Sequence, residues 1–370
     1  MKKKFKSIWW HKDLEKKDII KSLSYIINSE ELSTGKITSL LEKEISKFLK
    51  VKHIIMVSSG SMANLLAFMA LNIRPKDEII IPNVGWISVI NACKILNATP
   101  VIIDVQKSKP LIDVQQIEKF ISKKTKIIFP VYMNGRIANI SKLKNICKKR
   151  NLFLVEDAAQ AFGVKYKNKF LGTNGDIGIF STSITKNFTS GLGGFLATNN
   201  SSLANKIYSM RRHGFSDVQN IKNWDKYGGN FKITDLQSAI ARVQLKNMRK
   251  KFNTNIQNFN YFKKKLTHLK DYIKPVDLDT RFEIPVYNEF IVKNRDEFTK
   301  FLKKNNVQTR NSSPNFERVK YLKTKKSPRG YPNSALVEKN YLYLESGPGL
   351  QKKRIDQIVK VIDLFYKKKL

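Results

Sequence analysis

The chain has 370 residues, a length that suggests a large domain joined to a smaller one, and 41% of them are hydrophobic, which is enough for a substantial core. Two cysteines, Cys93 and Cys147, are too few and too far apart for a disulfide framework and favour a reducing, cytoplasmic setting. The formal net charge is +39, but the lysines are spread along the whole chain, which argues against a nucleic-acid-binding protein. No segment approaches the ~18 apolar residues of a membrane span, and the four scattered histidines lack metal-ligand spacing, so no metal site is expected.

Residues 1–35 come first and are expected to pack on the smaller domain or on a partner subunit. The segment 36–49 has apolar residues at helical spacing and predicts an amphipathic helix. Short apolar runs then alternate with helix-length segments: runs at 54–57, 79–81, 101–103, 127–131, 152–155, 177–180 and 195–198, with helices expected at 61–71, 87–95, 114–121 and 143–150. Apolar strands separated by helices predict an α/β fold with a mostly parallel central sheet covered by helices on both faces.

The pattern changes after residue 233. Thr234 is predicted to be the N-cap of a helix that continues past Gln244. Short strands and turns follow, with a final helix near 355–365. We therefore expect a large domain over residues 36–245 and a smaller C-terminal α/β domain over residues 246–370.

Two segments contain candidate residues for binding an anion and a cation. Ser58-Ser59-Gly60-Ser61 follows a predicted strand and opens a predicted helix, where backbone N–H groups and hydroxyls favour an anion. An ordinary helix cap would look the same. Asp157 lies at the end of an apolar strand, where α/β proteins place ligands and where a carboxylate can pair with a protonated heterocycle. A helix N-cap is the alternative for Asp157.

The third candidate is a lysine. Lys186 follows Ser181 by five residues and precedes the glycine-rich turn 191–194, which is an unusual place for a solvated lysine. Lysine forms Schiff bases with carbonyl compounds when its surroundings favour the neutral amine. In so lysine-rich a chain, only these neighbours single Lys186 out.

The order and spacing of these motifs resemble the DegT/DnrJ/EryC1/StrS family of sugar aminotransferases, which have the fold-type I architecture of pyridoxal-phosphate (PLP) enzymes. The resemblance covers nearly the whole chain. It is found at residues 32–35, 58–63, 82–91, 131–135, 156–163, 172–176, 180–194, 212–214, 229–232, 234–245 and 347–350.

The resemblance implies a role for each matching residue. Lys186 would form the Schiff base with PLP and then move protons as the general acid and base. Asp157 would pair with the ring nitrogen, Gln160 would bond the 3-oxygen of the ring, and Trp86 would stack on the ring face. The phosphate would be bound by Gly60, Ser61 and Ser181, and also by Asn230 of a neighbouring subunit, which implies a homodimer with shared active sites.

Some positions depart from the family pattern. Tyr132 stands where the family often has His, Gly85 where it often has Thr, and Leu192 where it usually has Glu. We expect Tyr132 and Leu192 to lie near the substrate. Lys186 is intact, which disfavours a dehydratase of the type that has His at this position.

The resemblance implies an aminotransferase that moves an amino group, with glutamate as the expected donor, to a keto carbon of a nucleotide-linked deoxysugar. Such enzymes usually serve the synthesis of lipopolysaccharide, capsule or another surface polysaccharide. A relative that binds PLP or sugar nucleotide without turnover is one alternative, and the intact Lys186, Asp157 and Gln160 speak against it. A basic protein that binds anionic surfaces is the other alternative.

Overall fold

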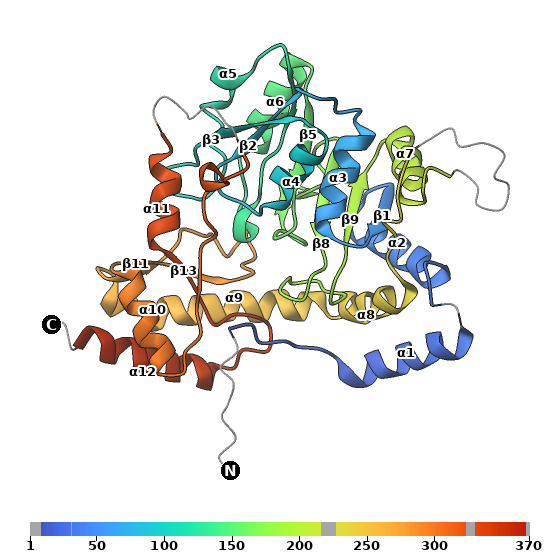
Figure 1. The fold of residues 1–370 in the computed structure, drawn as a ribbon. Helices are drawn as coiled ribbons and strands as arrows, with labels where there is room; N and C mark the ends of the chain where they lie inside the picture. The colour runs from blue at the N-terminus through green and yellow to red at the C-terminus, as the bar shows by residue number, and fades with distance from the viewer. Residues whose placement is uncertain (1–8, 31, 216–226, 323–329, 368–370) are drawn as a thin grey trace.

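The computed structural model describes residues 9–30, 32–215, 227–322 and 330–367, and it contains two main sheets (Figure 1). The larger sheet has seven strands in the order β1-β9-β8-β5-β4-β2-β3. Their bounds are β1 His53–Val57, β2 Glu78–Pro82, β3 Thr99–Ile103, β4 Thr125–Ile128, β5 Phe153–Asp157, β8 Ile177–Ser181 and β9 Gly194–Thr198. Every pairing is parallel except the two that β9 makes, with β1 and with β8. The predicted mostly parallel α/β fold is therefore confirmed.

Both faces of the large sheet are buried, because successive side chains of a strand point to opposite sides. In β1, Ile55 and Val57 pack with one face, whereas Ile54 and Met56 pack with the other. The first face is covered by α3 Gly60–Ala70, α4 Ser88–Ile95 and α7 Ser201–Arg211. The second is covered by α2 Lys36–Leu49, α5 Ile117–Phe120, α6 Ile140–Arg150 and α8 Asp235–Lys246.

The smaller sheet is antiparallel, with strand order β10-β11-β13-β12. Its strands are β10 Ile273–Pro275, β11 Asn288–Val292, β12 Arg310–Asn311 and β13 Tyr341–Leu344. It shares a hydrophobic core with α9 Met248–Lys265, α10 Arg295–Lys304 and α12 Lys352–Lys367, whereas α11 Pro332–Asn340 precedes β13. The long helix α9 runs from the end of α8 to this smaller layer (Figure 1). The domain boundary that we propose after residue 245 thus falls at the end of α8.

The N-terminal segment touches both layers. Trp10 forms a parallel bridge with Ser346 after β13, and α1 Lys16–Ser29 packs against α8. Residues 1–8 and 31, which belong to the same predicted segment, lie outside the described residues.

Two predicted elements are shorter than expected. The helix expected over 114–121 is limited to α5, and the strand expected over 127–131 ends at Ile128. Pro130 lacks an N–H group, so the ladder is interrupted there, although Phe129 N–H still donates to Ile80 O. The remaining short elements are the hairpin β6 Lys165–Tyr166 with β7 Lys169–Phe170, and the 3-10 turns η1 Met133–Gly135, η2 Thr267–Leu269 and η3 Phe316–Arg318. No helix among the described residues has the length and apolarity needed to cross a bilayer.

Candidate active site

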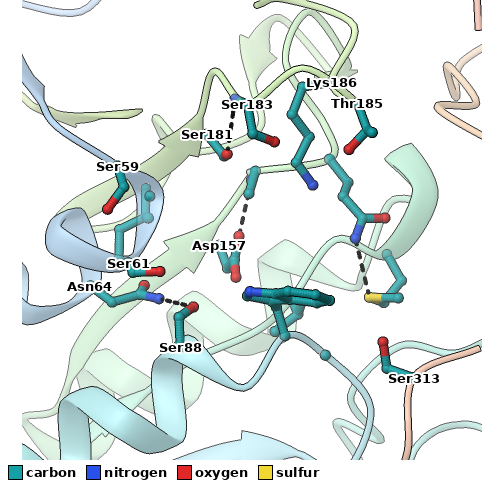
Figure 2. Close-up of a pocket in the computed structure, with 18 of the residues that line it drawn as sticks. Ser59, Ser61, Asn64, Ser88, Asp157, Ser181, Ser183, Thr185, Lys186 and Ser313 are labelled. Carbon is teal, nitrogen blue, oxygen red and sulfur yellow. Dashed lines mark hydrogen bonds between the residues drawn. The ribbon is translucent and has the colours of Figure 1, made fainter. Parts of the chain in front are cut away.

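A cavity of about 250 Å³ lies where the carboxyl ends of β5 and β8 meet the start of α3 (Figure 2). This is the edge at which open α/β sheets bind ligands. Every predicted site residue except Asn230 lines it, namely Gly60, Ser61, Trp86, Asp157, Gln160, Ser181 and Lys186. Residues about 130 positions apart in the chain therefore meet in one place.

One end of the cavity is suited to an anion. The hydroxyls of Ser59, Ser61 and Ser181 gather at the N-terminus of α3 (Figure 2), where the helix has unpaired N–H groups. The Ser59 hydroxyl caps this helix by accepting from Met62 N–H at 3.2 Å. A Cβ on Gly60 would lie 3.1 Å from Ser181 Cβ, so glycine lets β8 approach the helix start closely. A phosphate group fits the donors gathered here.

Asp157 is a buried carboxylate that accepts a hydrogen bond from Ala159 N–H at 3.0 Å. Burial raises the pKa of Asp157 above its usual value, while the Ala159 N–H and the charge of Lys186 act to lower it. A buried carboxylate of this kind favours a cationic partner. A protonated ring nitrogen in the cavity would be such a partner.

Lys186 extends from the loop between β8 and β9, and its side chain points toward Asp157 (Figure 2). The loop is held by its own bonds: Thr182 and Ser190 join through their hydroxyls at 2.7 Å, and Ser190 N–H donates to Thr182 O at 2.9 Å. Next to the lysine, Asn187 accepts a 2.7 Å bond from Asn255 of α9. The lysine amine is therefore presented to the cavity by a fixed backbone.

The amide of Gln160 has a defined orientation. Its Oε1 accepts the backbone N–H of Asn134 at 2.8 Å, and an N–H group can donate only to the oxygen of the amide. The NH₂ end is thereby left near Met133, which also lines the cavity. Gln160 can therefore donate a hydrogen bond to an oxygen of a bound ligand.

Two of the three departures from the family pattern border the cavity. Leu192 is largely exposed at its rim. Gly85 lines it too, and a Cβ on Gly85 would lie 3.1 Å from Phe316 Cζ. The ring of Phe316 thus packs closely where a side chain at position 85 would stand.

The expectation that Tyr132 lies near the substrate is wrong. Its neighbours Val131 and Met133 line the cavity, while Tyr132 is fully buried in the core on the opposite side of the sheet. Its hydroxyl donates to Glu156 Oε2 at 2.5 Å, and Glu156 also accepts the N–H groups of Gly172, Asn174 and Gly175. Burial raises the pKa of both Tyr132 and Glu156.

The C-terminal part of the chain supplies a wall that the sequence did not reveal. It is formed by Tyr287, Arg310, Ser313 and Tyr343. These residues belong to no recognisable motif, because it is the antiparallel pairing of β12 with β13 that brings Arg310 beside Tyr343.

Asn230 does not line the cavity of its own chain. It is exposed and pairs through its backbone with Arg212. The carbonyl of its neighbour Phe231 accepts the N–H of Ser58, just before α3. Asn230 is therefore close in the chain to the anion-binding end without contributing to it.

Comparison with known proteins gives the family. The profile of the DegT/DnrJ/EryC1/StrS aminotransferase family matches residues 13–363. The chain belongs to this family. This aminotransferase is 27% identical over 354 residues to the GDP-perosamine synthase of Vibrio cholerae, which covers 90% of this chain and 92% of the relative.

Solved structures agree on the fold. Helicobacter pylori PseC, an aminotransferase involved in the biosynthesis of pseudoaminic acid, superposes with a TM-score of 0.89 at 21% identity and covers 98% of this chain and 100% of its own. A GDP-4-keto-6-deoxymannose-3-dehydratase with a trapped PLP-glutamate geminal diamine superposes with a TM-score of 0.85 at 23% identity. It covers 95% of this chain and 98% of its own. The aminotransferase uses PLP and acts on a nucleotide-linked sugar.

Proposed function

We propose that this aminotransferase moves the amino group of glutamate to carbon 4 of a GDP-linked 4-keto-6-deoxy sugar, in the cytoplasm, for the synthesis of a surface polysaccharide. The observation that carries the proposal is the cavity in which Lys186 points toward the buried Asp157, beside the anion-binding end of α3. The nature of the sugar is supported by the similarity to a GDP-perosamine synthase over most of both chains, since perosamine is a 4-amino-4,6-dideoxy sugar.

The proposed roles of the chain's residues follow from their places in the cavity. PLP, when bound, withdraws electrons from the carbon that carries nitrogen and so loosens its proton. Gly60, Ser61 and Ser181 hold the phosphate, and Gln160 donates to a ring oxygen. The carboxylate of Asp157 keeps the ring nitrogen protonated.

Lys186 carries out the proton transfer. Its amine faces the cavity and takes the proton that leaves the carbon bearing nitrogen. In the first half of the cycle the donor loses its nitrogen, takes an oxygen from water and leaves as a keto acid. In the second half the keto sugar gains that nitrogen and its oxygen leaves as water, so amine and ketone are exchanged once per full cycle. The single cavity suits this order, because the two substrates occupy it in turn.

A screen of substrates tests this function. The purified holoenzyme is incubated with glutamate together with one keto sugar per reaction, either GDP-linked or linked to another nucleotide. The masses of the products are measured by mass spectrometry. We expect the GDP-linked 4-keto-6-deoxy sugar to gain an amino group in place of its keto oxygen, with one 2-oxoglutarate formed per sugar. Loss of a hydroxyl oxygen from the sugar without amination would assign the chain to the dehydratases instead.

We further propose that two copies of the chain form a homodimer, in which Asn230 reaches the phosphate bound by the partner. Support comes from the exposed position of Asn230 and from the large side chain of Tyr227, close to it in the chain, which is also open to solvent. Tyrosine is among the residues enriched at protein–protein interfaces. A two-fold axis would repeat every such contact, giving two shared sites.

Mixing inactive variants tests the shared site. Lys186→Ala and Asn230→Ala chains are each expected to be severely impaired alone. In a mixed dimer, one site combines the intact Lys186 of one chain with the intact Asn230 of the other, so random reassembly should restore about a quarter of the sites. Sedimentation should show a dimer, and PLP should raise its apparent stability. A fully active monomer, or an Asn230→Ala chain with normal turnover, would refute the shared site.

A further inference from the structure

The cavity is lined by one cationic side chain that has no role in cofactor binding or in the proposed chemistry. Among the described residues lining it, three are charged: Asp157, Lys186 and Arg310. The first two have the roles proposed above. Arg310 is half-buried in β12 and comes from the C-terminal wall.

The guanidinium of Arg310 is held by aromatic rings. Its Cζ lies 5.2 Å from the ring centroid of Trp9 and 5.5 Å from that of Trp86, distances typical of cation–π contacts. Within the described residues, Arg310 has no ion pair and no side-chain hydrogen bond. Contacts of this kind fix the position of the guanidinium and leave its N–H groups available to a ligand.

The wall that carries Arg310 is itself held in place. The backbone N–H of Trp9 donates to Gln308 Oε1 at 3.0 Å, and the backbone carbonyl of Trp9 accepts the N–H of Ser346 at 2.8 Å. Trp9 also packs on Tyr287 with ring centroids 5.7 Å apart, and Tyr287 lines the cavity. The N-terminal segment thus helps to build a pocket around one arginine.

Both substrates are anionic, but they place their charge differently. The α-carboxylate of an amino acid is attached to the reacting carbon itself. The diphosphate of a nucleotide-linked 4-keto sugar is separated from carbon 4 by the sugar ring. Arg310 lies over Trp86, the residue proposed to stack on the cofactor ring, and it lines the same cavity as Lys186, the residue proposed to take the proton from the reacting carbon. Its planar fork of N–H groups matches a carboxylate.

We infer that Arg310 binds the α-carboxylate of the amino-acid donor and is the specificity-determining residue for the first half of the reaction. This inference rests on the proposed function, because it needs an amino-acid donor. The same guanidinium faces the neutral part of the sugar in the second half of the reaction, so the sugar depends on it far less.

Three variants of the full-length holoenzyme test the inference: Arg310→Gln, Arg310→Lys and, as the matched control, Arg281→Gln. Arg281 is an exposed arginine of the C-terminal part that pairs with Asp279. Glutarate, a dicarboxylate without an amino group, is titrated into each by calorimetry. The reactions of glutamate, L-alanine and 4-aminobutyrate are followed by cofactor absorbance without sugar, and the KM of the keto sugar is measured separately.

For Arg310→Gln we expect the KM of glutamate to rise about 10- to 100-fold and glutarate binding to weaken by a similar factor. The rate of the reaction with L-alanine should fall by a similar factor. The rate with 4-aminobutyrate, which lacks an α-carboxylate, should equal that of the wild type. The KM of the sugar should change by less than about 3-fold, Arg310→Lys should recover part of the loss, and Arg281→Gln should match the wild type.

Two results would overturn the inference. One is a raised sugar KM with unchanged glutamate kinetics, which would place Arg310 on the diphosphate. The other is loss of the 4-aminobutyrate reaction with L-alanine unaffected, which would place it on the distal carboxylate. If the wild type reacts with no amino donor but still binds glutarate through Arg310, the proposed function fails and the carboxylate site stands.

Discussion

Lys186→Ala is expected to lower turnover by at least about 10³-fold while leaving the fold intact. The lysine amine is the basic group presented to the cavity by the fixed loop between β8 and β9, and an alanine there can neither bind PLP covalently nor move a proton. Lys186 is half-buried and forms no salt bridge within the described residues, so its replacement by alanine should leave the packing of the core unchanged.

Product formation is measured by mass spectrometry with glutamate and the keto sugar, and circular dichroism checks the fold. Lys119→Ala, at an exposed lysine of α5, is the matched control and should keep wild-type turnover. A small primary amine added to Lys186→Ala should restore part of the rate, because it replaces the missing base. Near-normal turnover without added amine would show that another group moves the proton.

Asp157→Asn is expected to retain PLP but to lose about 10²- to 10⁴-fold in turnover. The substitution keeps the shape of the side chain and the acceptor for Ala159 N–H, so the site itself should persist. It removes the negative charge, which is the feature of Asp157 that would hold a proton on the ring nitrogen. Burial raises the pKa of this carboxyl, and a cationic partner in the cavity would favour its charged form.

A modified cofactor separates charge from geometry in this variant. PLP methylated on its ring nitrogen keeps a positive charge without help from a carboxylate. Reconstituting Asp157→Asn with it should recover a large part of the lost rate, whereas Asp363→Asn, on the surface helix α12, should need no rescue. If methylated PLP gives no gain over ordinary PLP, the loss comes from altered geometry and the proposed role of Asp157 is wrong.

The elements with strong local signals could be predicted from the sequence. The helix expected over 36–49 has the bounds of α2, and Thr234 caps α8 in a capping box with Gln237. The anion-binding turn, Asp157 and Lys186 stand at strand ends or in the loops beside them, so their meeting at one edge of the sheet follows from its parallel order.

The rest depends on tertiary contacts. Arg310, Tyr287 and Tyr343 join the site because the smaller sheet folds back on the larger one, which no local pattern encodes. Tyr132 was placed wrongly because resemblance gave its position in the chain but not its side: residues 131 and 133 face the cavity, and the residue between them faces away. The role proposed for Asn230 involves the phosphate bound by a second chain, so no pattern within one chain encodes it.

Chemical trapping shows which lysine binds the cofactor. Purified holoenzyme is scanned for the absorption band of bound PLP, reduced with borohydride, digested and mapped by mass spectrometry. We expect reduction to bleach the band and to leave the mass of the reduced cofactor on the peptide that contains Lys186, at one per chain. A cofactor mass on a different lysine, or a protein that binds no PLP, would contradict it.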